Sequence, residues 1–482
     1  MIEVPDVSLV AILPEVILVL GAVAALIVVV SSADAHRWLP WVAGLTVAGA
    51  AAGTAVQWVD TVEQGTTFSY ADMIILDQQT VVARVILLTV LTLALLIGWR
   101  YLLELGTRGG EALALVFLAT AGFMFMGSSI HLIMLFLGLE VGSISLYVLA
   151  GLGQQSRQSD EAAIKYFLLG SVASAIFLYG AALLYAGTGA LDYRSLFGFF
   201  ARDVIVFQDG VLTAGMALVF VGLLFKIAAA PFHSWAPDVY QGSPAGIVGF
   251  MAAVAKIGAI VAILRLVQVP FADLLETYQL PIAAVAAVSV AVGTLYAIVQ
   301  SDLRRVLAYS GVAHAGFLLT AVATGIAGEV QLLFYLATYV VTLVAAFGIV
   351  ALVEGPGSAG SALDGYRGLS RRSPGLAAVL SVLMLGLAGM PVTSGFIAKF
   401  GVFTEAWNAG LEWLVIVGLL ATVAAFFFYL RVIVLMYFEE GEGEPTGVGR
   451  LAWAGLTLSV AVTLVLGVYP TPLLEALTAA LG

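Results

Sequence analysis

Residues 223–238 read LLFKIAAAPFHSWAPD, and this stretch indicates how the chain is built. An apolar helical run carries Lys226, and Pro231 interrupts the run five residues later. Proline lacks a backbone N–H, and its ring clashes with the carbonyl four residues earlier, so a helix does not pass through it undisturbed. A charged residue inside a membrane is costly and is usually functional. The stretch therefore predicts a discontinuous membrane helix with an ionisable site at its break.

The composition of the whole chain is that of a membrane protein. Of its 482 residues, 62% are hydrophobic and 10% are charged, whereas soluble domains are about 45–50% apolar and about 25% charged. The absence of cysteine excludes disulfides, cysteine-ligated iron–sulfur clusters and thioether-attached haem. The net charge of −11 argues against nucleic acid as a partner. The N-terminal stretch has no basic region of a signal peptide, so we interpret it as the first span.

Apolar runs of about 20 residues, each able to cross the roughly 30 Å hydrocarbon core, recur from end to end. They predict an all-α polytopic membrane protein with about 14 transmembrane helices, at approximately 9–30, 38–59, 79–99, 112–128, 131–152, 162–187, 211–229, 243–267, 280–299, 303–325, 330–353, 374–401, 411–438 and 451–469. Pro231 and Pro391 interrupt the seventh and twelfth spans.

Spans 4–8 and 9–13 form two units of five helices, each with its break in the fourth helix. Because five is odd, the units have opposite topology, as in inverted-repeat transporters. We therefore expect two inverted five-helix repeats with discontinuous helices 7 and 12. The predicted organisation is three N-terminal transmembrane helices (1–110), the first five-helix repeat (111–267), the second inverted five-helix repeat (268–440) and a C-terminal transmembrane helix (441–482).

Basic residues in the loops predict the orientation. Loops after odd-numbered spans carry ten arginines, whereas loops after even-numbered spans, with the neighbouring span ends, carry four. Because cytoplasmic loops of membrane proteins are enriched in Lys and Arg, we expect the odd-numbered loops inside and both termini outside. One loop contains GPGSAG (355–360), which matches the dinucleotide pattern G-x-G-x-x-G. It follows a membrane helix and not a strand, so we interpret it as a plain loop.

The four lysines of the chain, Lys165, Lys226, Lys256 and Lys399, all fall inside predicted spans, whereas arginines dominate the loops. Each central charge costs about 2.5–3.5 kcal/mol on insertion scales, so four together cost roughly 10 kcal/mol. Lysine releases its proton when desolvated, whereas arginine stays charged. The lysines therefore predict a proton relay. Glu140 is the acidic residue placed near the middle of a span, and we propose it as the partner of Lys226.

Other interpretations of these residues stay open. Lys165 lies near the inner end of its span, where its ammonium group can reach the interface. The Glu140–Lys226 pair can be static and structural. His314 is mid-helix and is either a relay group or a packed, hydrogen-bonded ring. His233 follows the first break and has either a relay role or a role at the helix end.

Four stretches closely resemble the antiporter-like membrane subunits of respiratory complex I. They are DEAAIKYFLLGSVASAIFLYG (160–180), LLFKIAAAPFHSWAPDVYQGSP (223–244), SDLRRVLAYSGVAHAGF (301–317) and GMPVTSGFIAKFGVF (389–403). The resemblance covers roughly residues 110–440. Within these subunits the chain is most similar to the bacterial N-type, because it ends soon after span 14 and has a lysine, Lys399, in span 12.

The resemblance implies roles for individual residues. Glu140 matches the glutamate of span 5, and Lys226 matches the lysine of span 7. Lys256 matches a lysine that relays protons along the central polar axis, and Lys399 matches the residue of span 12 that leads to the outer face. Lys165 and His314 match a lysine of the N-type and a histidine of the relay.

The resemblance further implies a proton-translocating subunit of NADH–quinone oxidoreductase in the bacterial cell (inner) membrane. Such a subunit binds no cofactor, and FMN, iron–sulfur clusters and quinone are expected in partner subunits. Its expected partners are K-type and M-type neighbours, the lateral helix of the L-type subunit and the lipid bilayer. One alternative is a cation/proton antiporter subunit of the multi-subunit Na⁺/H⁺ type, and another is a purely structural spacer, against which the four lysines argue.

Overall fold

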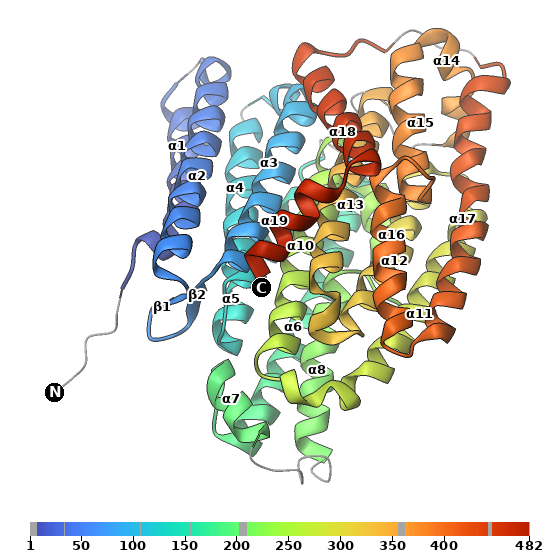
Figure 1. The fold of residues 1–482 in the computed structure, drawn as a ribbon. Helices are drawn as coiled ribbons and strands as arrows, with labels where there is room; N and C mark the ends of the chain where they lie inside the picture. The colour runs from blue at the N-terminus through green and yellow to red at the C-terminus, as the bar shows by residue number, and fades with distance from the viewer. Residues whose placement is uncertain are drawn as a thin grey trace.

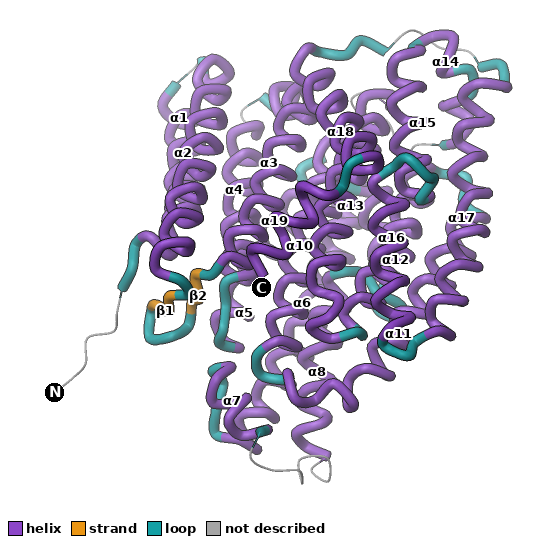
Figure 2. The backbone as a smooth tube through the Cα atoms, in the orientation of Figure 1, coloured by secondary structure: helices purple, strands orange, loops and turns teal. Residues whose placement is uncertain are grey.

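A computed structural model of the chain is a bundle of long helices (Figures 1 and 2). It describes residues 7–32, 34–106, 108–153, 156–201, 210–354, 362–441 and 446–481, so the GPGSAG loop lies outside the described residues. Within the described residues, twelve helices are long and apolar enough to cross a membrane. Two further spans are each divided into shorter helices, which brings the total in this part of the chain to the predicted fourteen.

Three N-terminal helices form one side of the bundle, namely α1 (Leu13–Ser31), which follows the short η1 (Val10–Ile12), α2 (Ala35–Gln64) and α3 (Gln78–Glu104). An antiparallel hairpin, β1 (Thr67–Ser69) and β2 (Ile74–Leu76), joins α2 to α3. Asp77 caps α3, because its carboxylate accepts a hydrogen bond from the Thr80 amide at 2.8 Å. The same carboxylate pairs with Arg265 at 2.5 and 2.9 Å, which ties α3 to the end of α10.

The first five-helix unit comprises α4 (Arg108–Gly127), α5 (Leu132–Ala150), α6 (Arg157–Thr188), α8 (Gly210–Lys226) with α9 (Trp235–Gly242), and α10 (Ala245–Gln268). Glycines allow α4 and α5 to approach closely, because a Cβ at Gly122 would lie 2.9 Å from the carbonyl oxygen of Gly138. Helix α10 is buried along its whole apolar window and forms the centre of the bundle.

The second unit comprises α11 (Leu275–Ile298), α12 (Leu303–Val322), α13 (Glu329–Glu354), α15 (Pro374–Ala388) with α16 (Ser394–Asn408), and α17 (Glu412–Phe438). Its first two helices also pack through glycine, because a Cβ at Gly316 would lie 2.6 Å from the carbonyl oxygen of Ala286. The described parts of its links contain four short helices, namely η3 (Ala272–Leu274), η4 (Gly325–Gly328), η5 (Leu363–Tyr366) and α14 (Leu369–Arg372).

Both predicted breaks are present. The first lies between the end of α8 at Lys226 and the start of α9 at Trp235, and the second between Ala388 and Ser394. Because proline cannot continue either helix, other groups bind the freed backbone. Ser289 of α11 accepts a hydrogen bond from the Ala230 amide at 2.9 Å.

The hydropathy pattern did not predict two short helices. Helix α7 (Tyr193–Phe200) lies between α6 and α8, and α19 (Thr471–Leu481) follows α18 (Arg450–Val468). Figure 1 shows α19 running obliquely across α3 and α13, with which it is in contact. Both helices are too short to span a bilayer, and a search for runs of about 20 apolar residues misses them.

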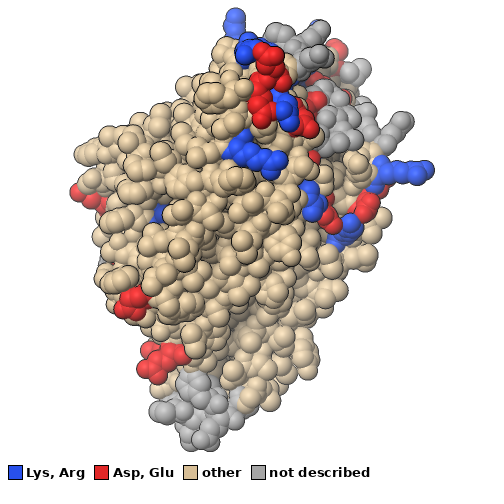
Figure 3. Space-filling model, turned by 90° about the vertical axis from the view of Figure 1, so that its right-hand side faces the viewer, with Lys and Arg blue, Asp and Glu red and all other residues tan. Residues whose placement is uncertain are grey.

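Charged side chains are concentrated at one end of the molecule. In Figure 3, Lys, Arg, Asp and Glu crowd the upper end, and a broad band almost without charge lies below. We call the upper end of Figure 1, with the α1–α2 and α3–α4 links, α14 and the start of α18, the basic end. Ion pairs such as Arg371–Glu440 at 2.9 Å neutralise part of its charge.

Candidate functional site: a buried row of lysines, tyrosines and a histidine

Lys226 is the last residue of α8, and its side chain is only 3% exposed. Its Nζ donates a hydrogen bond to the hydroxyl of Tyr147 at 3.0 Å. The ring centroids of Tyr147 and Tyr166 lie 4.9 and 5.6 Å from the same nitrogen. Aromatic faces attract a cation at these distances, so the ammonium group has both a hydroxyl acceptor and two rings around it.

The structure does not join Glu140 directly to Lys226. The carboxylate of Glu140, on α5, accepts a hydrogen bond from the Ser174 hydroxyl of α6, and no ion pair links it to the lysine in the described part of the chain. Tyr147 follows Glu140 by seven residues, about two turns along the same face of α5. Tyr147, and not Glu140, is therefore the direct partner of Lys226 in this state.

Lys256 lies in the middle of α10 and is 3% exposed. Its Nζ donates a hydrogen bond to the carbonyl oxygen of Gly311 on α12 at 2.6 Å, and a longer one to the hydroxyl of Tyr339 on α13 at 3.5 Å. A Cβ at Gly311 would stand 3.4 Å from that nitrogen, so glycine leaves the carbonyl open to the ammonium group. Lys256 of the first unit is thus bound entirely by helices of the second unit.

His314 continues the row on α12, three residues after Gly311 and on the same face. Its Nδ1 is 2.8 Å from the hydroxyl of Tyr335, and its Nε2 is 3.4 Å from that of Tyr429. Its ring stacks on Tyr339 with centroids 4.4 Å apart. Tyr339 therefore contacts both Lys256 and His314, which connects the two ionisable groups. A small cavity of about 10 Å³, close to the size of one water, lies beside the histidine.

Lys399 lies in α16, but its ammonium group reaches back across the second break. Its Nζ donates hydrogen bonds to the carbonyl oxygens of Ala388 at 2.9 Å and Leu387 at 3.3 Å, and lies 4.8 Å from the ring centroid of Phe317. The last helical residue before this break is Ala388, and the next residue, Gly389, adopts a left-handed conformation with φ +82°. The cavity beside His314 is also lined by Leu387, whose carbonyl oxygen binds Lys399.

Each break has a lysine beside it, but the two are held differently. Lys226 precedes its proline by five residues and Lys399 follows Pro391 by eight, so the sequence spacing does not match. Lys226 is the last residue of α8 and binds a tyrosine hydroxyl, whereas the Lys399 ammonium group binds carbonyl oxygens at the C-terminal end of α15. The helix dipole is negative at that end and favours a cation.

Two predicted site residues lie outside this row. Lys165 is 43% exposed near the basic end and pairs with Glu161 at 2.7 Å and Asp238 at 3.2 Å. His233 lies between α8 and α9, with its ring centroid 6.2 Å from that of Tyr309. Its Nδ1 has no hydrogen-bond partner among the described residues.

Sequence analysis missed a second intramembrane charge cluster. Glu15 of α1 is fully buried and pairs with Arg84 of α3, whose Nε and Nη2 donate to its Oε1 at 2.9 and 2.5 Å. Arg84 also donates to Gln57 of α2 at 2.8 Å, so the cluster links the three N-terminal helices. Glu140 is therefore not the sole acidic residue inside a span. The signal was available, because Glu15 lies in the apolar run LPEVILVL.

The described residues contain no group of three or more His, Cys, Asp or Glu side chains that could hold a metal ion. Discontinuous helices in two inverted units, with ammonium groups at their breaks, instead define an antiporter-like membrane protein. The chain belongs to the NADH:quinone oxidoreductase/Mrp antiporter transmembrane family, whose family model matches residues 129–425.

Individual curated relatives identify the type of subunit within this family. The chain is 38% identical to NADH-quinone oxidoreductase subunit N of Trichlorobacter lovleyi, over 97% of this chain and 96% of that protein. It is 45% identical to the protein of the same name from Mycobacterium bovis, over 77% of this chain and 71% of that one. The resemblance to the N-type membrane subunits of complex I is thus confirmed.

Solved structures of other proteins superpose on nearly the whole chain. A chain of respiratory complex I from Thermus thermophilus, determined with bound aureothin, superposes with a TM-score of 0.80 at 32% identity, over 97% of this chain and all of that chain. A chain of the Mrp complex from Dietzia sp. superposes with a TM-score of 0.84 at 22% identity, over 98% and 96% of the two chains, and shares the fold. These similarities confirm the predicted fold class.

Proposed function

We propose that the chain is the N-type proton-translocating membrane subunit of NADH-quinone oxidoreductase, and that it couples electron transfer from NADH to quinone to proton pumping. The likeness to subunit N over almost the whole chain supports this assignment. The chain contains no cysteine, which agrees with electrons running through FMN, iron–sulfur clusters and quinone in partner subunits.

The observation that carries the proposal is the continuous contact from Lys256 through Tyr339 to His314. All three side chains are buried, and they come from helices of both units. In this proposal protons are taken up from the inner side, load Lys256 and Lys226, pass by His314 to Lys399 and leave on the outer side. Each group has a hydrogen-bonding partner, which a proton relay requires.

Glu140 is the proposed point at which a neighbouring subunit acts on the relay. It is half-buried on α5, whereas the three lysines of the row are buried. Tyr147, two turns along the same helix face, holds Lys226. A change in charge or position at Glu140 therefore reaches the lysine through α5 and Tyr147. Alternating attraction between Glu140 and Lys226 would load and release the proton.

The surface at the two breaks supports a place between partner subunits. Pro231, Pro391 and Val392 are exposed although they lie between two halves of a span. Non-helical backbone at membrane depth is tolerated against protein or water but not against lipid. We propose that membrane subunits of the same complex, namely the K-type and M-type neighbours and the lateral helix of the L-type subunit, cover these surfaces.

The distribution of arginines between the two ends of the molecule supports an orientation in the membrane. The basic end carries the links with most arginines, so we propose that it faces the cytoplasm and that both termini lie outside the bacterial inner membrane. Lys165 and His233 keep their proposed roles as accessory relay groups near the inner end and the first break.

The test replaces Lys226 with alanine and Glu140 with glutamine in the assembled complex. We expect proton pumping into membrane vesicles and NADH-driven quinone reduction to fall together. Lys165→Ala is the matched comparison, because that lysine lies outside the buried row and should cost less activity. Normal pumping by fully assembled Lys226→Ala and Glu140→Gln variants would show that the pair mechanism is wrong.

The second candidate function is a cation/proton antiporter subunit of the multi-subunit Na⁺/H⁺ type, and the shared fold of the Mrp complex chain favours it. This alternative expects sodium-dependent transport without NADH oxidation. The leading proposal expects the chain to copurify with FMN and iron–sulfur clusters. Absorbance spectra and sodium dependence of the purified assembly distinguish the two.

A further inference from the structure

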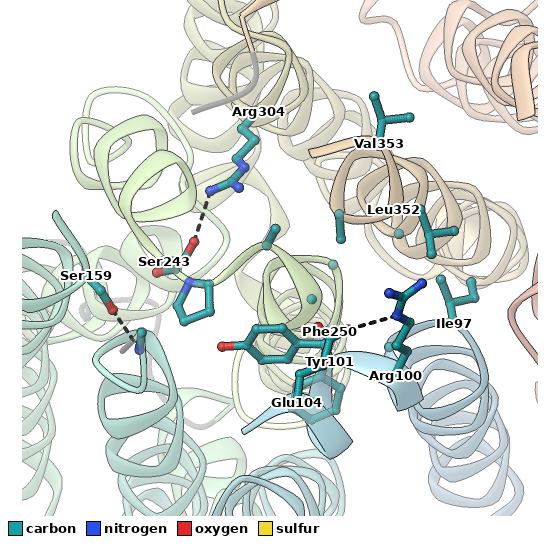
Figure 4. Close-up of a pocket in the computed structure, with 18 of the residues that line it drawn as sticks. Ile97, Arg100, Tyr101, Glu104, Ser159, Ser243, Phe250, Arg304, Leu352 and Val353 are labelled. Atoms are coloured by element: carbon teal, nitrogen blue, oxygen red, sulfur yellow. Dashed lines mark hydrogen bonds and ion pairs between the residues drawn. The ribbon is translucent and has the colours of Figure 1, made fainter. Parts of the chain in front are cut away.

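A cavity of about 810 Å³ opens at the basic end, away from the buried row (Figure 4). Its lining comes from the ends of α3, α9 and α13 and the starts of α6, α10 and α12. The volume lies in the range of small-molecule sites, which is about 300–1,000 Å³. The proposed proton relay does not use this cavity, so its lining requires a separate explanation.

One wall of the cavity is the N-terminal end of a long helix without a side-chain cap. Helix α10 begins at Ala245 after Pro244, which makes no side-chain cap. The Ile247 amide donates to the carbonyl oxygen of Pro244 at 3.0 Å, which leaves the amides of Ala245 and Gly246 for a ligand. Pro244, Ala245 and Gly246 all line the cavity. Such amides and the positive end of the helix dipole together form a binding site for anions. The helix runs for 24 residues, so the dipole is fully developed.

Ser243 supplies an independent indication of a ligand. It is 1% exposed, lines the cavity, and its hydroxyl has no hydrogen-bond partner among the described residues. Its carbonyl oxygen accepts a hydrogen bond from Arg304 Nη1 at 3.0 Å, which fixes the turn before α10 (Figure 4). A buried hydroxyl without a partner is costly, and a bound anion would accept its hydrogen bond.

The arginines of the lining differ in how they are paired. Arg304 is paired with Glu354, and Arg100 donates to Glu104 at 2.8 Å. Arg157, the first residue of α6, is exposed and has no ion-pair partner among the described residues. Gly242 holds the start of α6 against the turn before α10, because a Cβ there would lie 2.7 Å from the carbonyl oxygen of Gln158. Arg157 and the uncapped α10 end therefore belong to neighbouring walls.

The opposite side of the cavity is partly apolar. In Figure 4, Ser159 and Ser243 lie on one side, and Ile97, Leu352 and Val353 lie on the other, next to Arg100, which is paired with Glu104. A ligand that fits both sides carries an anionic head and an apolar portion. Phosphate is the anion that helix N-termini and arginine side chains recognise together. Basic pockets between membrane helices on the cytoplasmic side bind the phosphate head groups of lipids.

We propose that this cavity binds a phosphate-bearing anion, with its phosphate at the α10 N-terminus, Ser243 and Arg157, and that an anionic phospholipid supplies it. The phosphate accepts hydrogen bonds from the Ala245 and Gly246 amides and the Ser243 hydroxyl, and Arg157 balances its charge. The apolar wall packs against the start of the acyl chains. A soluble phosphate shares the head chemistry but leaves that wall empty.

The experiment measures lipid binding to the full chain in the purified, delipidated complex by native mass spectrometry. The probes are phosphatidylglycerol, phosphatidylcholine and inorganic phosphate. We expect Arg157→Gln to weaken phosphatidylglycerol binding on the order of tenfold, because it removes one charge-assisted contact. Ser243→Ala should weaken binding by a smaller factor. Arg37→Gln is the matched control, because Arg37 is 73% exposed at the same end but does not line the cavity.

Several outcomes decide the proposal. Tighter binding of phosphatidylglycerol than of phosphatidylcholine, lost in Arg157→Gln and retained in Arg37→Gln, supports a lipid. Displacement of the lipid by inorganic phosphate at similar concentrations supports the same phosphate site with a soluble occupant. Equal binding by Arg157→Gln, Ser243→Ala and the unmodified chain overturns the site, as does an equal loss in Arg37→Gln. Thermal unfolding of each variant in detergent verifies that the fold is intact.

Discussion

Replacement of Gly389 by alanine tests the position of the Lys399 ammonium group without altering the lysine itself. Gly389 follows α15 with φ +82°, in the left-handed region. An added Cβ would lie 2.9 Å from Lys399 Cδ and 3.4 Å from its Nζ, so the lysine side chain has to move. The Lys399 ammonium group would then lose its hydrogen bonds to the carbonyl oxygens of Leu387 and Ala388.

The expected magnitude has two parts. The left-handed conformation costs an L-residue about 1–2 kcal/mol, which destabilises the fold but leaves the lysine site intact. Displacing the ammonium group removes hydrogen bonds to a charged group, each worth about 1.5–3 kcal/mol. If one such bond is lost in the transfer step, the proton-pumping rate falls roughly tenfold to a hundredfold.

Gly410→Ala is the matched control. Gly410 has φ +76°, nearly the same strain, but an added Cβ there meets nothing within 4 Å. The assay compares proton pumping and NADH-driven quinone reduction in vesicles, normalised to assembled complex. We expect Gly389→Ala to lose both activities and Gly410→Ala to keep them. An equal loss in both variants would refute the reasoning, because backbone strain would then account for the whole effect, and so would full activity of Gly389→Ala.

Three further predictions concern other contacts. Tyr147→Phe keeps the ring beside the first break but removes the hydroxyl that binds the ammonium group, so pumping should fall by about tenfold. Glu15→Gln removes the charge that pairs with a buried guanidinium of α3, and the free energy of unfolding should fall by about 3–5 kcal/mol, measured by thermal unfolding in detergent. Burial alone would raise the pKa of the Asp77 carboxyl, but the charge and hydrogen bonds of Arg265 outweigh burial and hold the pKa below its ordinary value. Ionised Asp77 therefore stabilises the fold above about pH 4, the ordinary range of a free carboxyl, and thermal unfolding should show this stabilisation lost as the pH falls below that range.

Each of these predictions has its own control. Tyr185→Phe alters an exposed tyrosine of α6 and should leave pumping unchanged. Glu63→Gln alters an exposed carboxylate of α2, so an equal loss of stability there would contradict the account of the Glu15 cluster. Asp77→Asn should lower stability at neutral pH and abolish the acid-dependent loss. An unchanged acid profile in that variant would assign the loss to other carboxylates.

Hydropathy and proline placement predicted most of the fold. The fourteen spans and both breaks follow from apolar run length and from Pro231 and Pro391, because lipid and helix geometry impose these patterns locally. Burial of Lys226, Lys256 and Lys399 also followed, since a central position in an apolar run leaves no route to water.

The partners of those lysines could not be predicted. The chain contains seventeen tyrosines, and no spacing distinguishes the few that bind the buried lysines, such as Tyr147 and Tyr339. Their roles depend on how each helix is rotated against its neighbours. The same rotation decides that Tyr147, and not Glu140, binds Lys226. Lys165 is 43% exposed near the end of its span, which is the interfacial arrangement that the sequence left open, and its role in the relay stays a prediction.

The contact of Lys399 with two backbone carbonyls has a consequence for ion selectivity. Carbonyl oxygens at the C-terminal end of a half-helix bind sodium ions in many transporters. Here a covalently attached ammonium group occupies the corresponding position. A metal ion would have to displace it, whereas a proton can leave and return while the lysine side chain remains attached to α16. In the proposed relay, the tether would therefore favour a proton over a metal ion at this position.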